Sequence, residues 1–570
     1  MGLVERDEAA GGESGAIGAR TLVLGAVLVA LLLFWRLGAL PLLEPDEGRY
    51  TEIPREMLAT HDFVTPRLDG VLYFEKPPLV YWINAAAIAL FGLNETAARL
   101  GSAACAVGGL ALAYLLGAAA AGRRAGAIAA AALGTMPYFV ALGRLATTDM
   151  TLTFCLTATL TCFWLAQAAA DPRRARRLWL GAFAGAALAL LAKGLIGVVI
   201  PGAIVLLWLL ATGRWEVLRR VPWAGGTALL LAIAAPWHVL AALRNPDFLW
   251  FYFVHEHLLR YLTPVAERRE PVWFFLAVVG LGCAPWSGLI PSALRLARDG
   301  GWRERARANP DVVFLALWAG FVIAFFSISQ SKLIPYALPA APPLAVLIGR
   351  AADRLLAARA APSRLEAGGI VAGGLAVAAF GALFVVAGLG GIDRPGLTGV
   401  VSAGLLVPGA IASALALATV ATAFAGGWRV KLLVLFAAAA CVDVAVLAAG
   451  PVVARERSCR ELARTLRASL APGDAVFSYR DFPESLPVYL GRTVGVAGFL
   501  GELTFGASHL DAAERAARFP DVKQFASVWR APGRVWLVVA RSRLDQLDRD
   551  GVVGGRLVAA TPAYALLVNR

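Results

Sequence analysis

The chain has 570 residues and a mean hydropathy of +0.67, with 59% of its residues apolar and 16% charged. This balance excludes an ordinary soluble protein, because uncharged windows of about 20 residues, long enough to cross a hydrocarbon core of about 30 Å, recur along the sequence. The windows are continuously apolar instead of alternating, which predicts helices and not strands. We therefore expect a polytopic α-helical membrane protein.

The net charge of +14 comes from 53 Lys and Arg against 39 Asp and Glu. Most of the surplus lies in short loops between apolar windows, as the positive-inside rule predicts, so it does not indicate a nucleic-acid partner. The six cysteines have no paired spacing, which argues against a disulfide framework or a zinc knuckle.

About thirteen membrane-spanning helices are predicted, although the short segment 80–92 could instead be a half-buried helix that leads into the next span. The apolar windows are 21–40, 80–92 with 97–121, 125–143, 150–170, 178–196, 197–212, 222–243, 272–294, 312–328, 333–349, 366–390, 397–425 and 432–450. Arginine clusters occupy every second loop, which places those loops and the N-terminus in the cytoplasm and the opposite loops in the periplasm of a bacterial inner membrane.

The unusual polar segments all lie in loops of the predicted periplasmic face. They are 41–79, 143–150, 190–194, 244–271 and 329–336. Scattered loop charges would not gather on one face by chance, so these segments are expected to contain the functional site.

The composition changes after residue 450. Residues 1–450 are expected to form a transmembrane domain that includes the loop 41–79, and residues 451–570 a periplasmic α/β domain. Segment 455–470 has helical periodicity. Strands are predicted at 474–479, 534–540 and 564–570.

The densest mixed-charge segment, "LLEPDEGRYTEIPREM" (42–57), directly follows the first apolar window. Asp46 and Glu47 are candidate catalytic carboxylates, although charged residues also commonly mark the end of a span. The loop continues to Glu75 and Lys76 and is nearly forty residues long, which is typical of a functional loop. Lys76 is a candidate contact to a lipid phosphate, and Arg49 a second, forked one; the alternative for Lys76 is a snorkelling side chain.

Two further charged residues lie at predicted outer ends of spans. Asp149 is a candidate second carboxylate if it lies near Asp46, and otherwise an ordinary N-cap residue of the helix that follows. A lysine at a span end, such as Lys193, is costly unless it is paired, which makes it a candidate contact to the donor phosphate. Carboxylates and cations around an interfacial cavity favour an enzyme with a lipid-phosphate donor over a transporter.

Several ordered motifs resemble the lipid A 4-amino-4-deoxy-L-arabinose transferases (ArnT), which are related to the protein O-mannosyltransferases. They are "EPDEGRYTEIPREM", "GVLYFEKPPLVYW", "LLAKG", "PDFLWFYFVHEHLLRY" and "SKLIPYALPAAPPLAVLIG", with weaker likeness in "SLPVYLGRTV" and "GELTFG". The resemblance implies a GT-C type membrane glycosyltransferase with thirteen transmembrane helices and a small periplasmic α/β domain.

By similarity, Asp46 is the essential carboxylate and Asp149 a second acidic residue, while Arg49, Lys76 and Tyr336 bind the phosphate of an undecaprenyl-phosphate donor. The implied reaction is a single displacement that inverts the anomeric carbon and transfers the sugar to lipid A phosphate. The alternatives are a related polyprenyl-phosphate-dependent transferase that modifies another glycan or a protein, and a transporter of the lipid-linked sugar.

The resemblance also implies that Glu75 and His257 form a metal-binding pair for a divalent ion such as zinc. No other cofactor is expected.

Overall fold

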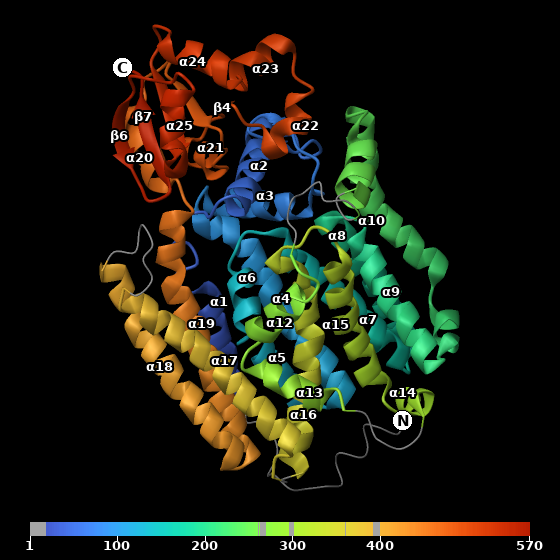
Figure 1. The fold of residues 1–570 in the computed structure, drawn as a ribbon. Coiled ribbons are helices and arrows are strands. Elements are labelled where there is room, and N and C mark those ends of the chain that lie inside the picture. The colour runs from blue at the N-terminus through green and yellow to red at the C-terminus, as the bar shows by residue number, and fades with distance from the viewer. Residues whose placement is uncertain (1–18, 260–261, 263–269, 296–300, 359–360, 391–398) are drawn as a thin grey trace.

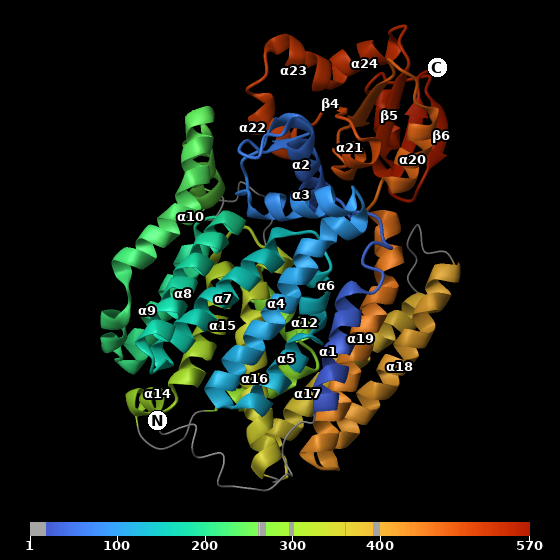
Figure 2. The ribbon, with the colours of Figure 1, turned by 180° about the vertical axis from the view of Figure 1, so that it is seen from behind.

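The structure is a computed structural model that describes residues 19–259, 262, 270–295, 301–358, 361–390 and 399–570. It has two parts, a large helical bundle and a smaller α/β domain that packs on one end of the bundle (Figures 1 and 2).

Eight helices of the described part are long and apolar enough to cross a membrane. They are α4 (Glu95–Ala121), α7 (Thr148–Ala168), α8 (Pro172–Lys193), α10 (Trp223–Arg244), α15 (Pro310–Ile328), α17 (Arg364–Gly388), α18 (Gly399–Phe424) and α19 (Trp428–Glu456). Two bent helix pairs raise this number to ten if each pair is one span. The total of about thirteen crossings stays a prediction.

The two bent pairs were predicted as straight spans. Helices α5 (Arg123–Leu133) and α6 (Pro137–Gly143) meet at 67°, and α12 (Phe274–Gly282) meets the segment of η4 (Trp286–Leu289) and α13 (Ile290–Ala293) at 106°. Pro137 begins α6, where a proline is tolerated because its missing N–H would have no helical partner.

The other helices of the bundle are shorter and include those nearest the α/β domain. They are α1 (Ala19–Phe34), α2 (Asp46–Thr60), α3 (Leu79–Phe91), α9 (Ile196–Thr212), η1 (Trp215–Arg220), the π-helix η2 (Trp250–Leu259), α14 (Trp302–Ala308), η5 (Ile334–Ala340) and α16 (Ala341–Ala358). Helix α3 corresponds to the ambiguous segment 80–92 and lies across the end of the bundle (Figures 1 and 2). A short hairpin of β1 (Arg67–Leu68) and β2 (Val71–Leu72) precedes it.

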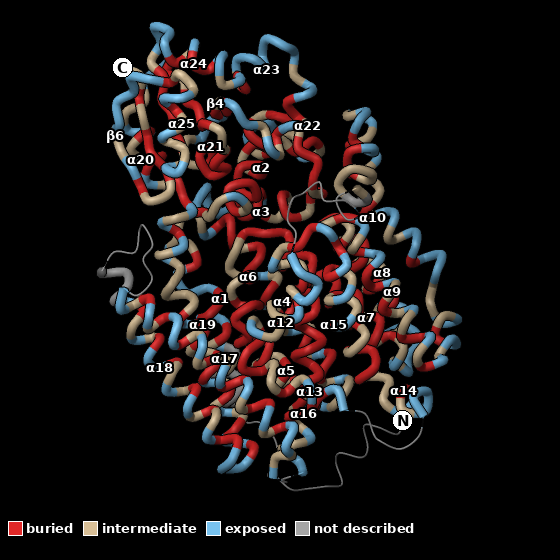
Figure 3. Tube along the Cα trace, viewed as in Figure 1, coloured by how far each residue is buried: buried red, intermediate tan, exposed pale blue. Residues whose placement is uncertain are grey.

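Helix α7 is the most buried of the eight apolar helices, with 78% of its apolar window inside the described structure, and red tube dominates the bundle centre in Figure 3. Its threonines are compatible with this position because Thr153, Thr157 and Thr159 each donate a hydrogen bond to the carbonyl one turn earlier. Helix α8 packs closely beside it, since a Cβ at Gly185 would lie 2.6 Å from the Thr159 hydroxyl.

The α/β domain contains a five-stranded sheet in the order β4-β3-β5-β7-β6. The strands are β3 (Ala475–Tyr479), β4 (Gly495–Ala497), β5 (Val535–Ala540), β6 (Arg556–Ala560) and β7 (Tyr564–Val568). Strand β3 is parallel to both β4 and β5, whereas β7 is antiparallel to both β5 and β6. The three strands predicted from the sequence are thereby confirmed.

Helices cover both faces of this sheet. They are α20 (Arg460–Ser469), α21 (Ser485–Leu490), η6 (Gly501–Leu503), α22 (Thr504–Ala507), α23 (Ala512–Arg518), α24 (Val522–Arg530), η7 (Arg541–Arg543) and α25 (Leu544–Arg549). Side chains alternate along β5: Trp536 joins the apolar cluster that contains Ile53 of α2, and Leu537 joins the one that contains Phe525 of α24. One face of the sheet therefore shares its core with α2. Helix α19 continues to Glu456, past the predicted boundary at residue 450.

Candidate active site

Asp46 begins α2, at the junction between the bundle and the α/β domain. Its side chain is 48% exposed, and its carboxylate lies 3.5 Å from Nη1 of Arg49. A carboxylate in the first turn of a helix is stabilised by the partial positive charge of the helix N-terminus. Asp46 is thus an accessible group next to a buried scaffold.

Arg49 lies one turn further along α2 and is almost fully buried. Its Nε and Nη2 donate to the two carboxylate oxygens of Glu484 at 2.9 and 3.0 Å, and Nη2 also lies 2.8 Å from Glu502. The rings of Tyr50 and Tyr73 lie 5.8 and 5.9 Å from the guanidinium carbon. We call Arg49, Glu484 and Glu502 the arginine clamp. It joins α2 to the α/β domain, so Arg49 orients α2, and a phosphate would reach it only by replacing a carboxylate.

Glu47 points to a different set of partners from those of Asp46. Its two oxygens accept hydrogen bonds from Nε and Nη2 of Arg99 at 2.7 and 2.6 Å, and from the backbone N–H groups of Leu43 and Ala146 at 3.0 and 2.9 Å. Arg99 also binds three carbonyls of the turn that follows α1. Since both oxygens of Glu47 are occupied and its side chain is 2% exposed, this geometry favours a positioning role over the predicted chemical one.

The contact to Ala146 connects Glu47 with the start of α7, where Asp149 lies in the first turn. Thr147 is the N-cap residue of α7 and makes no side-chain cap bond. Asp149 instead forms an ion pair with Lys193, the last residue of α8. Nζ of Lys193 also lies 4.6 Å from the ring centre of Tyr336 in η5. Asp149, Lys193 and Tyr336 therefore lie together, although they come from three separate elements. The sequence motifs identified the three residues but did not show that they are neighbours.

Tyr50 connects the two carboxylates electrostatically. Burial raises the pKa of its hydroxyl well above the usual range, Arg49 opposes the shift, and the charges of Asp46 and Asp149 are among those that raise it further. Both carboxylates therefore contribute to the electrostatic environment of the same buried hydroxyl.

Lys76 and Glu75 lie in the segment between the β1–β2 hairpin and α3. Nζ of Lys76 donates to the Glu75 carbonyl at 2.8 Å and lies 3.8 Å from the carboxylate of Glu256 in η2. Burial raises the pKa of Tyr73 well above its usual range, and the buried carboxylate of Glu75 is among the charges that raise it further; the ring of Tyr73 lies near the Arg49 guanidinium. Lys76 thus connects this segment with η2, and its side chain is 15% exposed.

The predicted metal pair is Glu75 and His257. The side chain of His257 lies outside the described residues. Among the side chains that are described, no group of three or more His, Cys, Asp or Glu is close enough to hold a metal ion. The zinc site stays a prediction.

Sequence reasoning assigned no role to Arg99, Glu484 or Glu502. Glu502 lies in "GELTFG", one of the motifs of the resemblance, and Glu484 directly precedes another, "SLPVYLGRTV". Their partner Arg49 lies 435 residues from Glu484, so no local spacing could connect them. The sequence signal that could have indicated a role for these two glutamates is an acidic residue in or next to an otherwise apolar segment that contains a motif.

Two families match parts of this chain. Residues 75–240 match the family described as dolichyl-phosphate-mannose-protein mannosyltransferase, and residues 462–568 match the aminoarabinose transferase C-terminal domain. Among solved structures, the chain is similar to ArnT from Cupriavidus metallidurans bound to undecaprenyl phosphate, with a TM-score of 0.79 and 28% identity across 96% of this chain and 98% of that one. The fold is that of a multi-pass, membrane-embedded glycosyltransferase.

Curated relatives narrow this class to one family. The undecaprenyl phosphate-α-4-amino-4-deoxy-L-arabinose arabinosyl transferase of Erwinia tasmaniensis is 30% identical over 548 residues, which are 92% of this chain and 94% of that protein. The chain belongs to this family of arabinosyl transferases, which confirms the resemblance seen in the motifs. The relative from Pseudomonas paraeruginosa is 36% identical, and the alignment spans 60% of its length and 60% of this chain.

Proposed function

We propose that this protein is an inverting glycosyltransferase that moves 4-amino-4-deoxy-L-arabinose from undecaprenyl phosphate to a phosphate group of lipid A. The observation that carries the proposal is the half-exposed Asp46 next to the buried arginine clamp, together with the Asp149–Lys193 and Lys76–Glu256 ion pairs. The family name of its relatives gives the donor, and the ArnT structure that it resembles contains undecaprenyl phosphate.

In the proposed reaction, a phosphate oxygen of the acceptor attacks the anomeric carbon of the sugar. The bond from that carbon to the undecaprenyl phosphate oxygen breaks, and the electron pair leaves with the lipid phosphate. No proton needs to be removed, since the attacking phosphate is already ionised near neutral pH. Asp46 orients the acceptor or stabilises the positive charge that develops on the sugar.

The leaving phosphate gains negative charge, which nearby cations and hydroxyls stabilise. Lys76 and Tyr336 are the proposed contacts, and Lys193 and Arg49 join them when the phosphate replaces one of their carboxylate partners. The described site thus holds its cations in ion pairs, where their charge is balanced before the donor arrives.

The role of Asp46 depends on the acceptor. If the acceptor were a hydroxyl of another glycan or of a protein, Asp46 would act as general base and take its proton. With lipid A as acceptor, the product would make the outer membrane less negative and confer resistance to cationic peptides such as polymyxin.

We also propose that the site and the α/β domain face the periplasm from the inner membrane. The support is the sequence pattern: arginine clusters lie in every second loop, and Asp46, Asp149, Lys193 and Tyr336 belong to the opposite set of loops or directly adjoin it.

The test uses the purified full-length chain in detergent with undecaprenyl phosphate–aminoarabinose and lipid A, and mass spectrometry follows the acceptor. We expect a gain of one sugar mass with the unmodified chain and with the surface control Asp545→Asn, and none with Asp46→Asn. Turnover in detergent would exclude a transporter, because transport needs a sealed membrane. An unmodified acceptor with an active donor preparation would contradict lipid A as the substrate and direct the assay to glycan and protein acceptors.

A further inference from the structure

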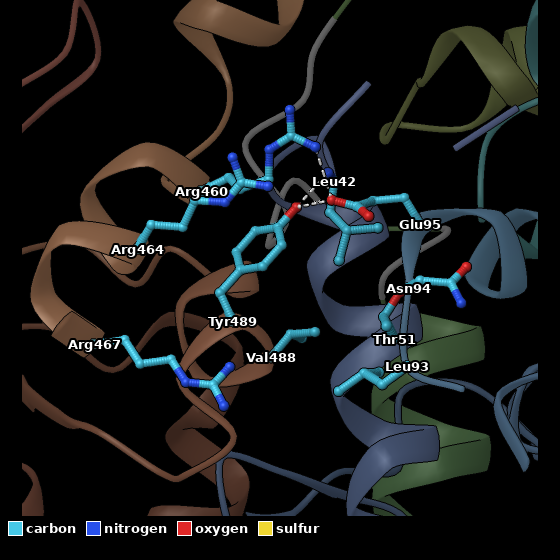
Figure 4. A pocket seen from close by; sticks show the side chains of 10 residues that line it. All are labelled: Leu42, Thr51, Leu93, Asn94, Glu95, Arg460, Arg464, Arg467, Val488 and Tyr489. Atoms are coloured by element: carbon cyan, nitrogen blue, oxygen red, sulfur yellow. Dashed lines mark hydrogen bonds and ion pairs between the residues drawn. The ribbon is translucent and has the colours of Figure 1, made fainter. Parts of the chain in front are cut away.

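A polar cavity of about 200 Å³ lies between the α/β domain and the start of α4, and none of the three clamp residues lines it (Figure 4). Three arginines of α20 line it, namely Arg460, Arg464 and Arg467. Their spacing of four and three residues places them on one face of the helix. In Figure 4 this face is turned toward α2 and the start of α4.

The charge in this cavity is unbalanced. Arg460 pairs with Glu95 at 3.0 Å, and the Tyr489 hydroxyl donates to the same carboxylate at 3.2 Å. Arg464 and Arg467 are exposed, and neither forms an ion pair with any other residue that the structure describes. Three guanidinium groups thus face one carboxylate, which leaves an excess of two positive charges.

The guanidinium groups of these arginines determine which kind of anion the cavity would bind. A guanidinium presents a planar fork of N–H donors that matches two oxygens of a phosphate, and it is more weakly hydrated than an ammonium group. Arg464 and Arg467 supply two such forks on one wall of the cavity, whereas the Tyr489 hydroxyl and the Asn94 amide are already hydrogen-bonded within the chain. Thr51 of α2 and Glu95 of α4 line the same cavity, which makes the site concave.

The rim of the cavity is apolar and exposed. Leu93 lines the cavity with 42% of its surface exposed, and Leu90 and Phe91 just before it are 76% and 61% exposed. These three residues lie where α3, which crosses the end of the bundle, leads into the membrane-spanning helix α4. Large apolar side chains at this level are expected to contact acyl chains.

We propose that this cavity, the α20 pocket, binds the phosphate headgroup of an anionic membrane lipid whose acyl chains lie along Leu90, Phe91 and Leu93. Bound there, the lipid connects α20 with the start of α4 and fixes the α/β domain on the membrane surface. The pocket contains no residue of the candidate active site, so the proposal does not depend on the proposed transferase activity.

Native mass spectrometry of the full-length chain, released from micelles with phosphatidylglycerol or phosphatidylcholine, tests the proposal. We expect the unmodified chain to retain more phosphatidylglycerol than phosphatidylcholine. The double variant Arg464→Gln/Arg467→Gln should weaken that binding about tenfold or more, because each basic side chain near an anionic lipid surface strengthens binding severalfold. The matched control Arg515→Gln/Arg541→Gln removes two exposed arginines of the same domain and should bind as the unmodified chain does.

Competition with inorganic phosphate separates the two possible sources of the anion. Millimolar phosphate that fully displaces the lipid would identify a free-phosphate site and overturn the lipid proposal. Equal retention of the two lipids, or equal phosphatidylglycerol binding by the α20 variant and the control, would also overturn it. Unchanged thermal unfolding of both variants confirms that they are folded.

Discussion

At the scale of single residues, exposure divides the charges around Asp46 into two kinds. Asp46 is 48% exposed, whereas Arg49 and Glu484 are each 6% exposed and Glu502 is 23% exposed. A group that meets a substrate must be accessible, and a group that fixes geometry benefits from burial, since ion pairs are stronger away from water. We therefore assign chemistry to Asp46 and orientation to the arginine clamp.

The first prediction concerns the clamp. Glu484→Gln removes a charge from the buried partner of Arg49 and should lower the free energy of unfolding by about 1–3 kcal/mol, the usual cost of an incompletely satisfied buried group. Thermal unfolding in detergent measures the change. The control is Glu514→Gln, which breaks the exposed pair with Arg518 in the same domain and should cost less than about 1 kcal/mol. Equal shifts for both variants would contradict the clamp.

A second prediction separates positioning from chemistry at Glu47. The variant Glu47→Leu leaves the Arg99 guanidinium buried without its carboxylate and should destabilise the chain by about 3–5 kcal/mol. The double variant Glu47→Leu/Arg99→Met removes both charges and should recover part of the stability and part of the transferase rate. Recovered stability with no recovered rate would indicate that Glu47 acts chemically after all.

At the scale of elements, α2 approaches the α/β domain at backbone contact distance. A Cβ at Gly48 would lie 2.3 Å from the backbone nitrogen of Ser485 and 2.5 Å from the carbonyl carbon of Glu484. Backbone atoms cannot yield as a flexible side chain does, so only glycine permits this approach. Gly48 lies between Asp46 and Arg49. Its close contact with the backbone of Glu484 and Ser485 therefore also fixes where Asp46 lies relative to the α/β domain.

The third prediction follows from that contact. Gly48→Ala should separate the α/β domain from α2, lower the transferase rate and increase cleavage of the chain by protease between α19 and α20. Gly320→Ala in α15 is the control, because a Cβ there meets nothing within 4 Å and alanine favours a helix. The interpretation fails if the two variants resist protease equally well.

At the scale of the whole molecule, the α/β domain contacts the bundle at several separate places. The clamp contacts α2, Arg460 pairs with Glu95 of α4, and His509 lies 3.1 Å from Asp247 before η2. Further contacts join Phe505 of α22 to Phe251 of η2, with ring centres 4.0 Å apart. These contacts hold the α/β domain against the bundle at α2, α4 and η2, and the clamp among them lies next to Asp46.

The fourth prediction concerns pH. Glu44 accepts hydrogen bonds from the N–H and hydroxyl of Ser485, and burial raises the pKa of its carboxyl from 4.5 to about 8. Between these values the folded chain keeps a proton that the unfolded chain has lost, so the free energy of unfolding should fall as pH rises from about 4.5 to 8. Thermal unfolding measured at a series of pH values should show a smaller dependence of stability on pH for Glu44→Gln. The dependence that is left should come from Glu56, whose pKa is also raised to about 8. A slope that Glu44→Gln leaves unchanged would contradict this origin.

Sequence reasoning predicted the features that depend on local pattern. Apolar windows predicted the helices, and alternation predicted strands such as 534–540. Motifs identified Asp46 and Asp149, and the charges of both raise the pKa of the buried Tyr50 hydroxyl beyond the effect of burial. The carboxylate partners of Arg49 could not be predicted because pairing across 435 residues depends on tertiary packing. The bend before Pro137 was missed although proline and Gly134 signalled it, since mean hydropathy does not register a break in a helix.

The arginine clamp also sets an order of events during synthesis. Arg49 emerges early from the ribosome, and its partner Glu484 follows 435 residues later. A nascent chain, or one truncated before β3, therefore displays Asp46 on a helix whose neighbouring guanidinium has not yet found either partner carboxylate. We propose that competence to consume donor lipid is acquired only when both of these carboxylates have been made and the α/β domain has folded, so that incomplete copies of the chain do not draw on the cell's supply of undecaprenyl phosphate.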